Sequence, residues 1–373
     1  MTASQTRYVA HPLSPEVERA LARLADAPDV QHIAVMPDVH LAEEVCVGVA
    51  VATSHLVYPA AVGGDIGCGM AALRFDASAD ALGDVGAARV LAGLYERVPR
   101  GRQQRAGFRL WPDGLDSDEL SHPSLAGLAR GDGRAQLGTL GSGNHFIELQ
   151  ADEEDRLWLM LHSGSRAIGP AIRAHHAARA EPAGHLRALD AGTEAGRAYL
   201  ADVAWALRYA DANRRHLIDA SVEAVAAAIG GRPEESSLVT CDHNHVRRET
   251  HRGAELWVHR KGAIAAGAGA PGIVPGSMGS PSYHVEGRGD PDALGSSAHG
   301  AGRALSRTDA RRTISRRDLA QQLEGVAWDH RRADALRDEA PAAYKDITRV
   351  MRAQRDLVRV VRRLRPLLSY KAA

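Results

Sequence analysis

Aromatic residues and cysteines are scarce in this chain, and each scarcity argues against particular classes of protein. Phe, Trp and Tyr together make up 4% of the 373 residues, which is little for the stacking surfaces of a dedicated single-strand nucleic-acid binder. The three cysteines, Cys46, Cys68 and Cys241, cannot all pair with one another. The first residues form no charged-then-apolar leader, and no apolar run reaches the length of a membrane span. These features predict a cytoplasmic protein with reduced thiols.

Net charge is also missing, because 46 Lys and Arg balance 46 Asp and Glu. Overall basicity therefore does not point to a nucleic-acid partner. The charge is unevenly spread, however, since residues 301–373 contain 18 basic and 9 acidic residues. This asymmetry predicts a phosphate-facing C-terminal part and a metal-facing remainder. Without internal repeats or low-complexity linkers, the sequence predicts one domain over residues 1–373.

Glycine-rich segments that surround histidines are what the chain does contain. The richest runs from Gly276 to Arg307 and includes His299, followed by Arg303 at four-residue spacing. Small side chains leave the backbone open to an anion, and arginine adds bidentate phosphate contacts. His299 could act as a nucleophile toward phosphorus, as a general acid or base, or as a metal ligand. Alternatively, the glycines serve tight turns and the histidine is a structural polar residue.

Five residues with metal-binding side chains each lie in a glycine-rich or polar turn at the end of an apolar run. They are Asp65, Cys68, His145, His162 and His243. Taken alone, Cys68 could be a buried cysteine that packs as a small apolar residue. The full set favours a transition-metal site, in which Asp65 could bridge two ions during phosphoryl transfer. These donors would bind several transition metals, zinc and copper among them, so the sequence does not choose the metal.

Hydrophobic periodicity and capping residues predict the main secondary structure. Helices are expected over residues 14–25, 79–98 and 191–229, and strands near residues 33–36, 45–52, 157–161, 238–241 and 255–259. Beyond Arg307 the pattern predicts helices at about residues 315–334 and 344–364, followed by a short apolar segment with Lys371.

Several longer motifs follow one another in a fixed order along almost the whole chain. They are Met36-Pro37-Asp38-Val39-His40, Asp65-Ile66-Gly67-Cys68-Gly69, Gly138-Thr139-Leu140-Gly141-Ser142-Gly143-Asn144-His145-Phe146, His162-Ser163-Gly164-Ser165-Arg166, His243-Asn244, Arg260-Lys261-Gly262-Ala263, Pro275-Gly276-Ser277-Met278-Gly279 and His299-Gly300-Ala301-Gly302-Arg303. In this order they resemble the RtcB family of GTP-dependent RNA ligases.

The resemblance implies an enzyme that uses GTP and two Mn²⁺ ions to join an RNA 3′-phosphate or 2′,3′-cyclic phosphate to a 5′-hydroxyl, as in RNA repair and tRNA splicing. It implies an α+β domain with mixed sheets and flanking helices around a deep metal-containing cleft. His299 matches the histidine that attacks the α-phosphorus of GTP and carries GMP. The resemblance leaves open whether an activating protein partner is required.

The remaining site residues follow from the same motif positions. The manganese ligands would be Asp65, Cys68, His145, His162 and His243. The residues that hold GMP would be Asn144, Phe146, Glu148, Ser277, Ser282, Tyr344 and Lys371, with Glu148 accepting from the guanine edge. The residues that face the RNA backbone or phosphates would be Arg166, Lys261, Arg303 and Arg307.

One stretch departs from the family pattern. Residues Leu41–Cys46 replace a glycine-containing turn and add two carboxylates, Glu43 and Glu44, beside the expected site. This departure supports an alternative, a metal-dependent 2′,3′-cyclic phosphodiesterase or a 3′-end guanylyl-capping enzyme that does not seal. A non-catalytic RNA-end binder is a third hypothesis, and the retention of His299 and of the five metal-binding positions argues against it.

Overall fold

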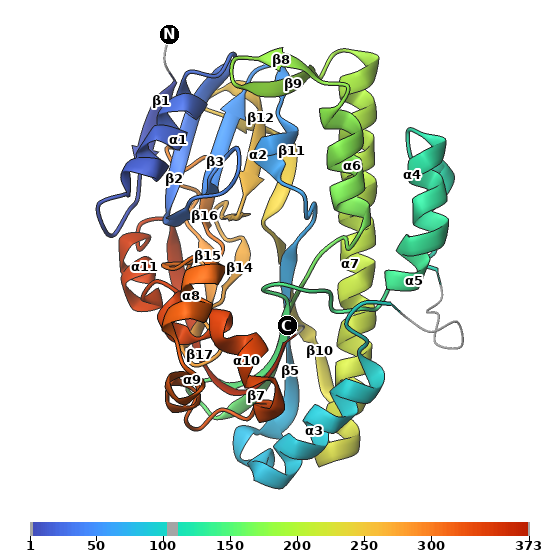
Figure 1. The fold of residues 1–373 in the computed structure, drawn as a ribbon, viewed down its shortest axis with the longest axis vertical. Coiled ribbons are helices and arrows are strands. Elements are labelled where there is room, and N and C mark those ends of the chain that lie inside the picture. The colour runs from blue at the N-terminus through green and yellow to red at the C-terminus, as the bar shows by residue number, and fades with distance from the viewer. Residues whose placement is uncertain (1–2, 103–110, 372–373) are drawn as a thin grey trace.

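Two large β-sheets form the centre of the protein, and helices pack around them (Figure 1). The structure is a computed structural model that describes residues 3–102 and 111–371. The mixture of several sheets with flanking helices confirms the predicted α+β class with a single domain. Within these described ranges, no helix has both the length and the apolar character needed to cross a membrane.

The first large sheet has five strands in the order β1-β2-β3-β12-β11. β1 pairs with β2 in parallel, and the other neighbours are antiparallel. Helix α1 (Pro15–Ala25) starts at the N-cap Ser14, as predicted, and packs its apolar face on β2 and β3. The strands are β1 Ser4–Arg7, β2 Val30–His40, β3 Val47–Thr53, β11 Asn244–His251 and β12 Ala254–Lys261.

The second large sheet has seven antiparallel strands in the order β10-β5-β7-β6-β17-β15-β14. Two small sheets, β13-β16 and β4-β9-β8, complete the strand set of the described residues. The strands of the second sheet are β5 Gly69–Ser78, β6 Phe146–Ala151, β7 Arg156–Ser163, β10 Pro233–Asp242, β14 Pro271–Val274, β15 Ser282–Gly287 and β17 Val358–Lys371. Those of the small sheets are β4 Leu56–Val57, β8 Glu181–Ala183, β9 Leu186–Asp190, β13 Ala263–Ala265 and β16 Ser296–Ala298.

A long helix, α7 (Glu194–Ile229), runs beside both large sheets (Figure 1). It begins at the N-cap Thr193 and ends at Gly230, whose φ of 77° is the left-handed conformation of a helix C-cap. This confirms the helix predicted over residues 191–229. With α3 (Gly83–Arg97), α7 packs on the seven-stranded sheet to form the largest apolar cluster among the described residues.

Shorter helices complete the fold. They are α2 Pro59–Val62, α4 Pro123–Leu128, α5 Arg134–Gln136, α6 Ile168–Ala177, α8 Arg307–Thr313, α9 Arg316–Gln322, α10 Ala333–Leu336 and α11 Ile347–Ala353. Helices α8 to α10 form a small apolar core around Met278. This core anchors the glycine-rich segment that contains Ser277.

The prediction of two long helices after Arg307 is wrong in both halves. Residues 315–334 do not form one helix, because α9 ends at Gln322 and the next α-helix, α10, begins only at Ala333. Only α11 is helical within residues 344–364, and the chain then enters β17. β17 lies between β6 and β15, where Leu364 pairs with Ser282 and Lys371 pairs with Phe146. The valines and arginines of β17 are compatible with a helix or a strand. The segment forms a strand because it pairs with a neighbouring strand on each side.

The ends of several strands converge at the boundary between the two large sheets. β2 ends at His40, β5 begins at Gly69, β6 begins at Phe146 and β7 ends at Ser163. His243 lies between β10 and β11, where the chain passes from the seven-stranded to the five-stranded sheet. This convergence brings the separated motifs of the sequence together.

Candidate active site

Four buried side chains, Cys68, His145, His162 and His243, meet at the boundary between the sheets, and each is 3–4% exposed. Asp65 and Cys68 come from the turn that precedes β5, which is closed by a hydrogen bond from Cys68 N to Asp65 O of 3.0 Å. The backbone of His243 donates to Cys68 O at 2.9 Å, which holds these two segments together. Gly67 in this turn has a φ of 71°, and a Cβ there would lie 2.9 Å from Ala210 of α7. Only glycine therefore allows the turn to lie against that helix.

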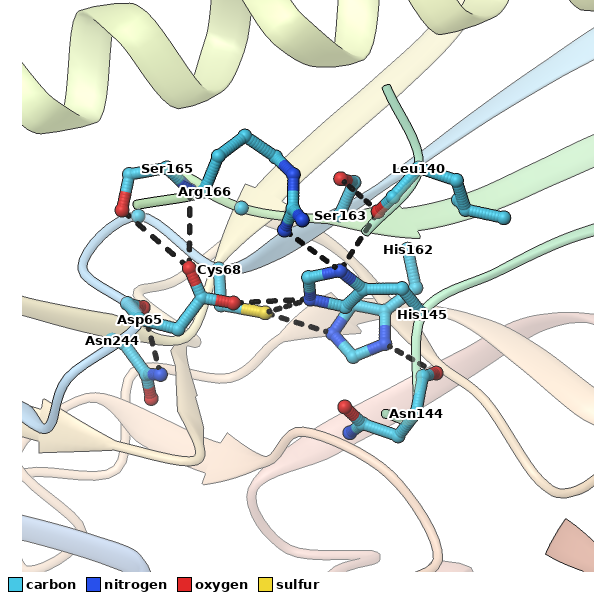
Figure 2. A network of polar contacts seen from close by, with 12 residues as sticks. Asp65, Cys68, Leu140, Asn144, His145, His162, Ser163, Ser165, Arg166 and Asn244 are labelled. Atoms are coloured by element: carbon cyan, nitrogen blue, oxygen red, sulfur yellow. Dashed lines mark hydrogen bonds and ion pairs between the residues drawn. The ribbon is translucent and has the colours of Figure 1, made fainter. Parts of the chain in front are cut away.

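The donor atoms of Asp65, Cys68, His145 and His162 point at one another (Figure 2). Cys68 Sγ lies 3.4 Å from His145 Nε2 and 3.1 Å from His162 Nε2. His162 Nε2 is in turn 3.3 Å from His243 Nε2, and His145 Nε2 is 3.0 Å from Asp65 Oδ2. The five predicted metal ligands therefore lie together as one cluster.

Backbone carbonyls fix the orientation of two of these imidazoles. His145 Nδ1 lies 2.9 Å from Leu140 O, and His162 Nδ1 lies 3.2 Å from Asn144 O (Figure 2). A carbonyl only accepts, so each Nδ1 carries the hydrogen and each Nε2 presents a lone pair to the cluster. Imidazole lone pairs, a thiol and a carboxylate that face one another form a set of donors that could hold a metal ion. The donor set thus fits a metal ion, and carbonyl-bound imidazoles are the usual support of metal-binding histidines.

The cluster divides into two groups that could each hold a metal ion. One contains Cys68, His162 and His243, and the other contains Asp65, Cys68 and His145. In each group the donor atoms lie within 4.8 Å of one another. The residue common to both groups is Cys68, whereas the sequence suggested that Asp65 could join two ions.

The pKa values of these side chains determine which of them must lose a proton when a metal ion binds. Burial lowers the pKa of both His162 and His243 well below the usual value, so both stay neutral, as metal ligands must. Burial, with help from Asp65, raises the pKa of the Cys68 thiol. Burial also raises the pKa of Asp65, but the contact with His145 and the charge of Arg166 outweigh it and bring this pKa to about 2. A metal ion that binds here must displace the thiol proton of Cys68.

His299 lies beside the cluster and is held by Asp38, a residue that the sequence analysis did not assign to the site. The ring centroids of His299 and His243 are 4.8 Å apart. His299 Nδ1 is 2.6 Å from Asp38 Oδ2, which also accepts from the His299 backbone at 3.2 Å. Asp38 is fully buried. Its carboxylate keeps the hydrogen on Nδ1 and so leaves Nε2 of His299 as a nucleophilic lone pair.

One cavity of about 250 Å³ joins the cluster, His299 and the glycine-rich segment. All seven residues predicted to hold GMP line it, and so do Lys261, Arg303 and Arg307. Of the predicted site residues, His145 and Arg166 do not line the cavity. Arg166 lies behind His145, with Nη1 3.5 Å from its Nδ1. The structure thus places Arg166 against the cluster and apart from the open space.

Glu148 lies in the wall of this cavity, on β6. It is 2% exposed and accepts from Gln150 Nε2 at 2.9 Å and from Ser369 Oγ at 3.1 Å. Burial raises the pKa of Glu148 to about 7, although the nearby charge of Lys371 opposes the shift. A carboxylate with this pKa gains from a ligand that brings hydrogen-bond donors.

A buried acidic pair, Asp338 and Glu339, organises the cationic side of the cavity, and the sequence analysis missed it. Glu339 Oε2 lies 2.6 Å from both Lys371 Nζ and Tyr344 Oη. Arg307 Nη1 lies 2.7 Å from both carboxylates. Burial raises the pKa of Glu339, but Lys371 and Arg307 outweigh it and bring this pKa to about 2. Glu339 therefore stays ionised, and its contacts fix the positions of Lys371 and Arg307.

Residues 41–46, the stretch that departs from the family pattern, lie at the edge of the cavity. Lys261, which lines the cavity, donates from Nζ to Val45 O at 2.7 Å. Glu44 forms an ion pair with Arg173 of α6. Burial and the charge of Arg173 lower the pKa of Lys261 to about 8. Of the two added carboxylates, that of Glu44 is therefore already neutralised by Arg173.

Donors that could hold a metal ion, an oriented histidine and a cation-lined cavity together fit the class of enzymes that transfer phosphorus-containing groups. Comparison with known proteins refines this class. The family profile described as tRNA-splicing ligase RtcB matches residues 20–122 and 116–372. The chain belongs to the RtcB family of RNA ligases.

Individual relatives agree with this assignment. An RNA-splicing ligase RtcB of Escherichia coli (strain K12) is 38% identical over 395 residues, which cover 96% of this chain and 95% of the relative. RNA-splicing ligase RtcB2 of E. coli (strain ATCC 25922) is 31% identical, with 93% and 89% covered. An RNA-splicing ligase RtcB of Mycobacterium tuberculosis is 32% identical, with 89% and 95% covered.

Proposed function

We propose that this protein joins an RNA 3′-phosphate or 2′,3′-cyclic phosphate to an RNA 5′-hydroxyl, with GTP as co-substrate. The observation that carries the proposal is the position of His299. Asp38 holds its Nδ1 at 2.6 Å, and its Nε2 is left free beside the metal-binding cluster and inside the cation-lined cavity. An imidazole so oriented is a nucleophile for an α-phosphorus.

In the first step, Nε2 of His299 forms a bond to the α-phosphorus of GTP, and pyrophosphate leaves with the electron pair of the broken bond. GMP then passes from His299 to the RNA 3′-phosphate. In the sealing step the 5′-hydroxyl oxygen attacks the phosphorus of that 3′-phosphate, and GMP departs. A cyclic phosphate is first opened to the 3′-phosphate in the same site.

Two Mn²⁺ ions would be held by Asp65, Cys68, His145, His162 and His243. When bound, such ions neutralise charge on the attacking and leaving oxygens of phosphoryl transfer. Cys68 would contribute to both metal groups, because its Sγ belongs to each. Arg166, behind His145, supports the cluster by its charge.

The guanosine part of GMP would lie among Asn144, Phe146, Glu148, Ser277, Ser282, Tyr344 and Lys371. Glu148 accepts from N1–H and from the amino group of guanine. Adenine does not present these two donors side by side. Lys261, Arg303 and Arg307 face the phosphates of the nucleotide and of the RNA ends.

A pH-dependence prediction follows for Glu148. Guanine donors favour the carboxylate, so guanosine binding tightens as pH rises through the Glu148 pKa of about 7. The affinity for guanosine should rise roughly tenfold from pH 6 to pH 8. The experiment uses guanosine and not GMP, because the phosphate of GMP would itself titrate in this pH range. Calorimetry on Glu148→Gln should show weaker binding without this pH dependence, and an unchanged slope would remove Glu148 from the guanine site.

A second prediction concerns Asp38. Asp38→Asn offers an amide hydrogen to Nδ1 of His299, which favours the tautomer with the hydrogen on Nε2 and blocks the nucleophile. Formation of the protein–GMP adduct should slow by roughly 10²-fold, while the concentration of GTP that gives half the rate stays the same. Single-turnover labelling measures both values. A change confined to GTP affinity would contradict the orienting role of Asp38.

We extend the proposal to the cellular context. Cys46, Cys68 and Cys241 are all free thiols, and free thiols suit the reducing cytoplasm. Residues 1–373 would act as a single ligase domain.

A second candidate function rests on residues 41–46. Leu41 is 52% exposed at the edge of a groove that adjoins the cavity. If this stretch obstructs the second RNA end, the protein caps 3′-phosphates with GMP or opens cyclic phosphates without sealing.

One experiment separates the two functions. The purified protein is incubated with Mn²⁺, GTP, a 5′-hydroxyl RNA and a labelled RNA that ends, in two parallel reactions, in a 3′-phosphate or in a 2′,3′-cyclic phosphate. A longer labelled product supports ligation. A labelled RNA that gains GMP or loses its cyclic phosphate but never lengthens supports the capping or phosphodiesterase function. Unchanged RNA in the presence of bound metal would refute both.

A further inference from the structure

Two consecutive residues of helix α7, Asn213 and Arg214, contact every chain segment that supplies a donor to the metal-binding cluster. Neither is one of the five proposed metal ligands. Asn213 is fully buried and Arg214 is 2% exposed. The helix face around them is apolar, since Tyr209, Ala210 and Leu217 on the neighbouring turns are fully buried. The polar pair therefore interrupts an apolar face at the place where α7 passes the cluster.

The guanidinium of Arg214 joins three of these segments. Its Nη1 donates to Gly67 O at 2.7 Å, in the turn before β5, and to Ser163 O at 3.3 Å, at the end of β7. Its Nη2 donates to Asp242 Oδ1 at 2.7 Å, at the end of β10. Each of these acceptors is the direct neighbour in the chain of a metal-binding residue, namely Cys68, His162 and His243, respectively. A planar guanidinium has several N–H groups in fixed directions, so one side chain can hold three segments at a set spacing.

The side-chain amide of Asn213 adds the fourth segment, the loop that leads to His145. Its Oδ1 accepts from Gly138 N at 2.8 Å, and its Nδ2 donates to Thr139 O at 3.3 Å. Nδ2 also lies 3.0 Å from Ser163 Oγ. Because a backbone N–H only donates and a carbonyl only accepts, these contacts fix which end of the amide is oxygen. Together the two side chains tie all four donor segments to one helix.

Asn213 is connected to the imidazole of His145 by a chain of hydrogen bonds, part of which is drawn in Figure 2. The Ser163 hydroxyl donates its single hydrogen to Leu140 O at 3.0 Å, so its oxygen accepts from Asn213 Nδ2. Leu140 O is the carbonyl that His145 Nδ1 contacts at 2.9 Å. Asn213 therefore holds the hydroxyl that holds this carbonyl, and loss of the amide would loosen both.

Stability alone does not explain the buried guanidinium of Arg214. A charge that leaves water loses its hydration, and apolar residues in place of a buried ion pair often give an equally stable or more stable protein. The carboxylate partner, Asp242, is itself 17% exposed. An apolar side chain at position 214 would continue the apolar face of α7. What the guanidinium adds is a fixed spacing of the three segments that must converge on metal ions.

Resting on the proposed function, we propose that Asn213 and Arg214 are positioning residues that hold the five donors at the spacing that two metal ions require. Arg214 sets the separation of Cys68 from the histidines of β7 and of the β10–β11 junction. Asn213 sets the place of His145 relative to them. Without this pair the donors remain in the chain, but their segments can move apart. Metal ions would then bind more weakly and in an altered geometry.

The test measures Co²⁺ binding by the metal-free protein, without GTP or RNA. Co²⁺ is the probe because it binds such donors more tightly than Mn²⁺, and because its visible absorption reports ligand geometry and thiolate coordination. Competition with a coloured chelator gives the affinity. In Asn213→Ala and Arg214→Lys the affinity should fall by roughly 10–100-fold. At saturating Co²⁺ the absorption bands of both variants should also differ from those of wild type.

The same helix supplies matched controls. Arg215 follows the pair, is exposed and forms an ion pair with Asp211 of α7. Ser221 is fully buried, and its hydroxyl donates to Leu217 O within the helix. Arg215→Ala and Ser221→Ala should bind Co²⁺ with the affinity and the spectrum of wild type. Circular dichroism and thermal unfolding of the metal-free proteins report the fold of every variant.

Weaker binding together with an altered spectrum, in variants that keep the metal-free fold, supports the assignment. Wild-type affinity and spectrum in either variant would overturn the role of that residue. Weaker binding with a wild-type spectrum at saturation would overturn the positioning role, because a merely structural residue leaves the geometry unchanged. An equal loss in Ser221→Ala, or loss of the metal-free fold in both variants, would overturn it as well, since the pair would then only stabilise α7.

Failure of the proposed function gives a different result. A wild-type protein that binds Co²⁺ but, with Mn²⁺ and GTP, neither labels His299 nor seals RNA refutes the ligase function, and the comparison of Co²⁺ binding between variants still decides the positioning role. A wild-type protein that binds no Co²⁺ would overturn the metal centre and this assignment together.

Discussion

Replacing His299 by alanine should abolish the transfer of GMP to the protein and every later step. Among the described residues that line the cavity, no other histidine has its Nδ1 held by a buried carboxylate. This contact leaves Nε2 of His299 free beside the cationic side chains. GTP labelled at the α-phosphate, followed by denaturation of the protein, measures the adduct directly. The wild-type protein should carry label and His299→Ala should carry none.

Metal content provides the control for this variant. His299 belongs to neither of the two groups that could hold a metal ion, so elemental analysis should find the same metal content in His299→Ala as in wild type. A labelled His299→Ala protein would show that another residue is the nucleophile. Loss of metal together with loss of label would show that His299 supports the cluster instead.

Replacing Cys68 by alanine should remove the bound metal and reduce both labelling and ligation to background. Sγ of Cys68 lies 3.4 Å from His145 Nε2 and 3.1 Å from His162 Nε2, and it belongs to both groups that could hold a metal ion. Loss of an outer-shell partner alone typically costs about 10–100-fold in metal affinity or activity. Removal of a donor common to two ions should therefore cost more than this.

Cys241→Ala is the matched control, because this thiol is half-buried on β10 and belongs to neither metal group. It should retain metal and activity. Elemental analysis after gel filtration, with Mn²⁺ supplied beforehand, measures the metal content of both variants. Unchanged metal in Cys68→Ala would contradict its role as the donor common to both groups.

The residues of the cluster could be predicted from sequence because each stands in a local pattern. A glycine-rich turn that follows an apolar run marks a strand end, and strand ends of neighbouring strands lie close together. The structure brings Asp65, Cys68, His145, His162 and His243 into one cluster as expected. The sequence could not show which of them is common to both groups, since this depends on side-chain positions across four separate segments.

Other parts of the site had no local signal. Asp338 and Glu339 look like solvent-exposed acidic residues in sequence, and only the packing of α8 and β17 buries them beside Arg307 and Lys371. The role of Asp38 was equally hidden, although its motif was visible, because its partner His299 lies 261 positions away. The first half of β17, residues 358–364, was predicted as helix, because its neighbours β6 and β15 come from distant segments and leave no local signal.

The central claim is that GMP becomes bonded to His299. Mass spectrometry of peptides, prepared under neutral conditions after incubation with Mn²⁺ and GTP, tests it most directly. We predict that the peptide containing His299 gains the mass of GMP, that fragmentation places the addition on the imidazole, and that 3′-phosphate RNA removes it. An adduct on a lysine, or no adduct while metal is bound and ligation proceeds, would contradict the account.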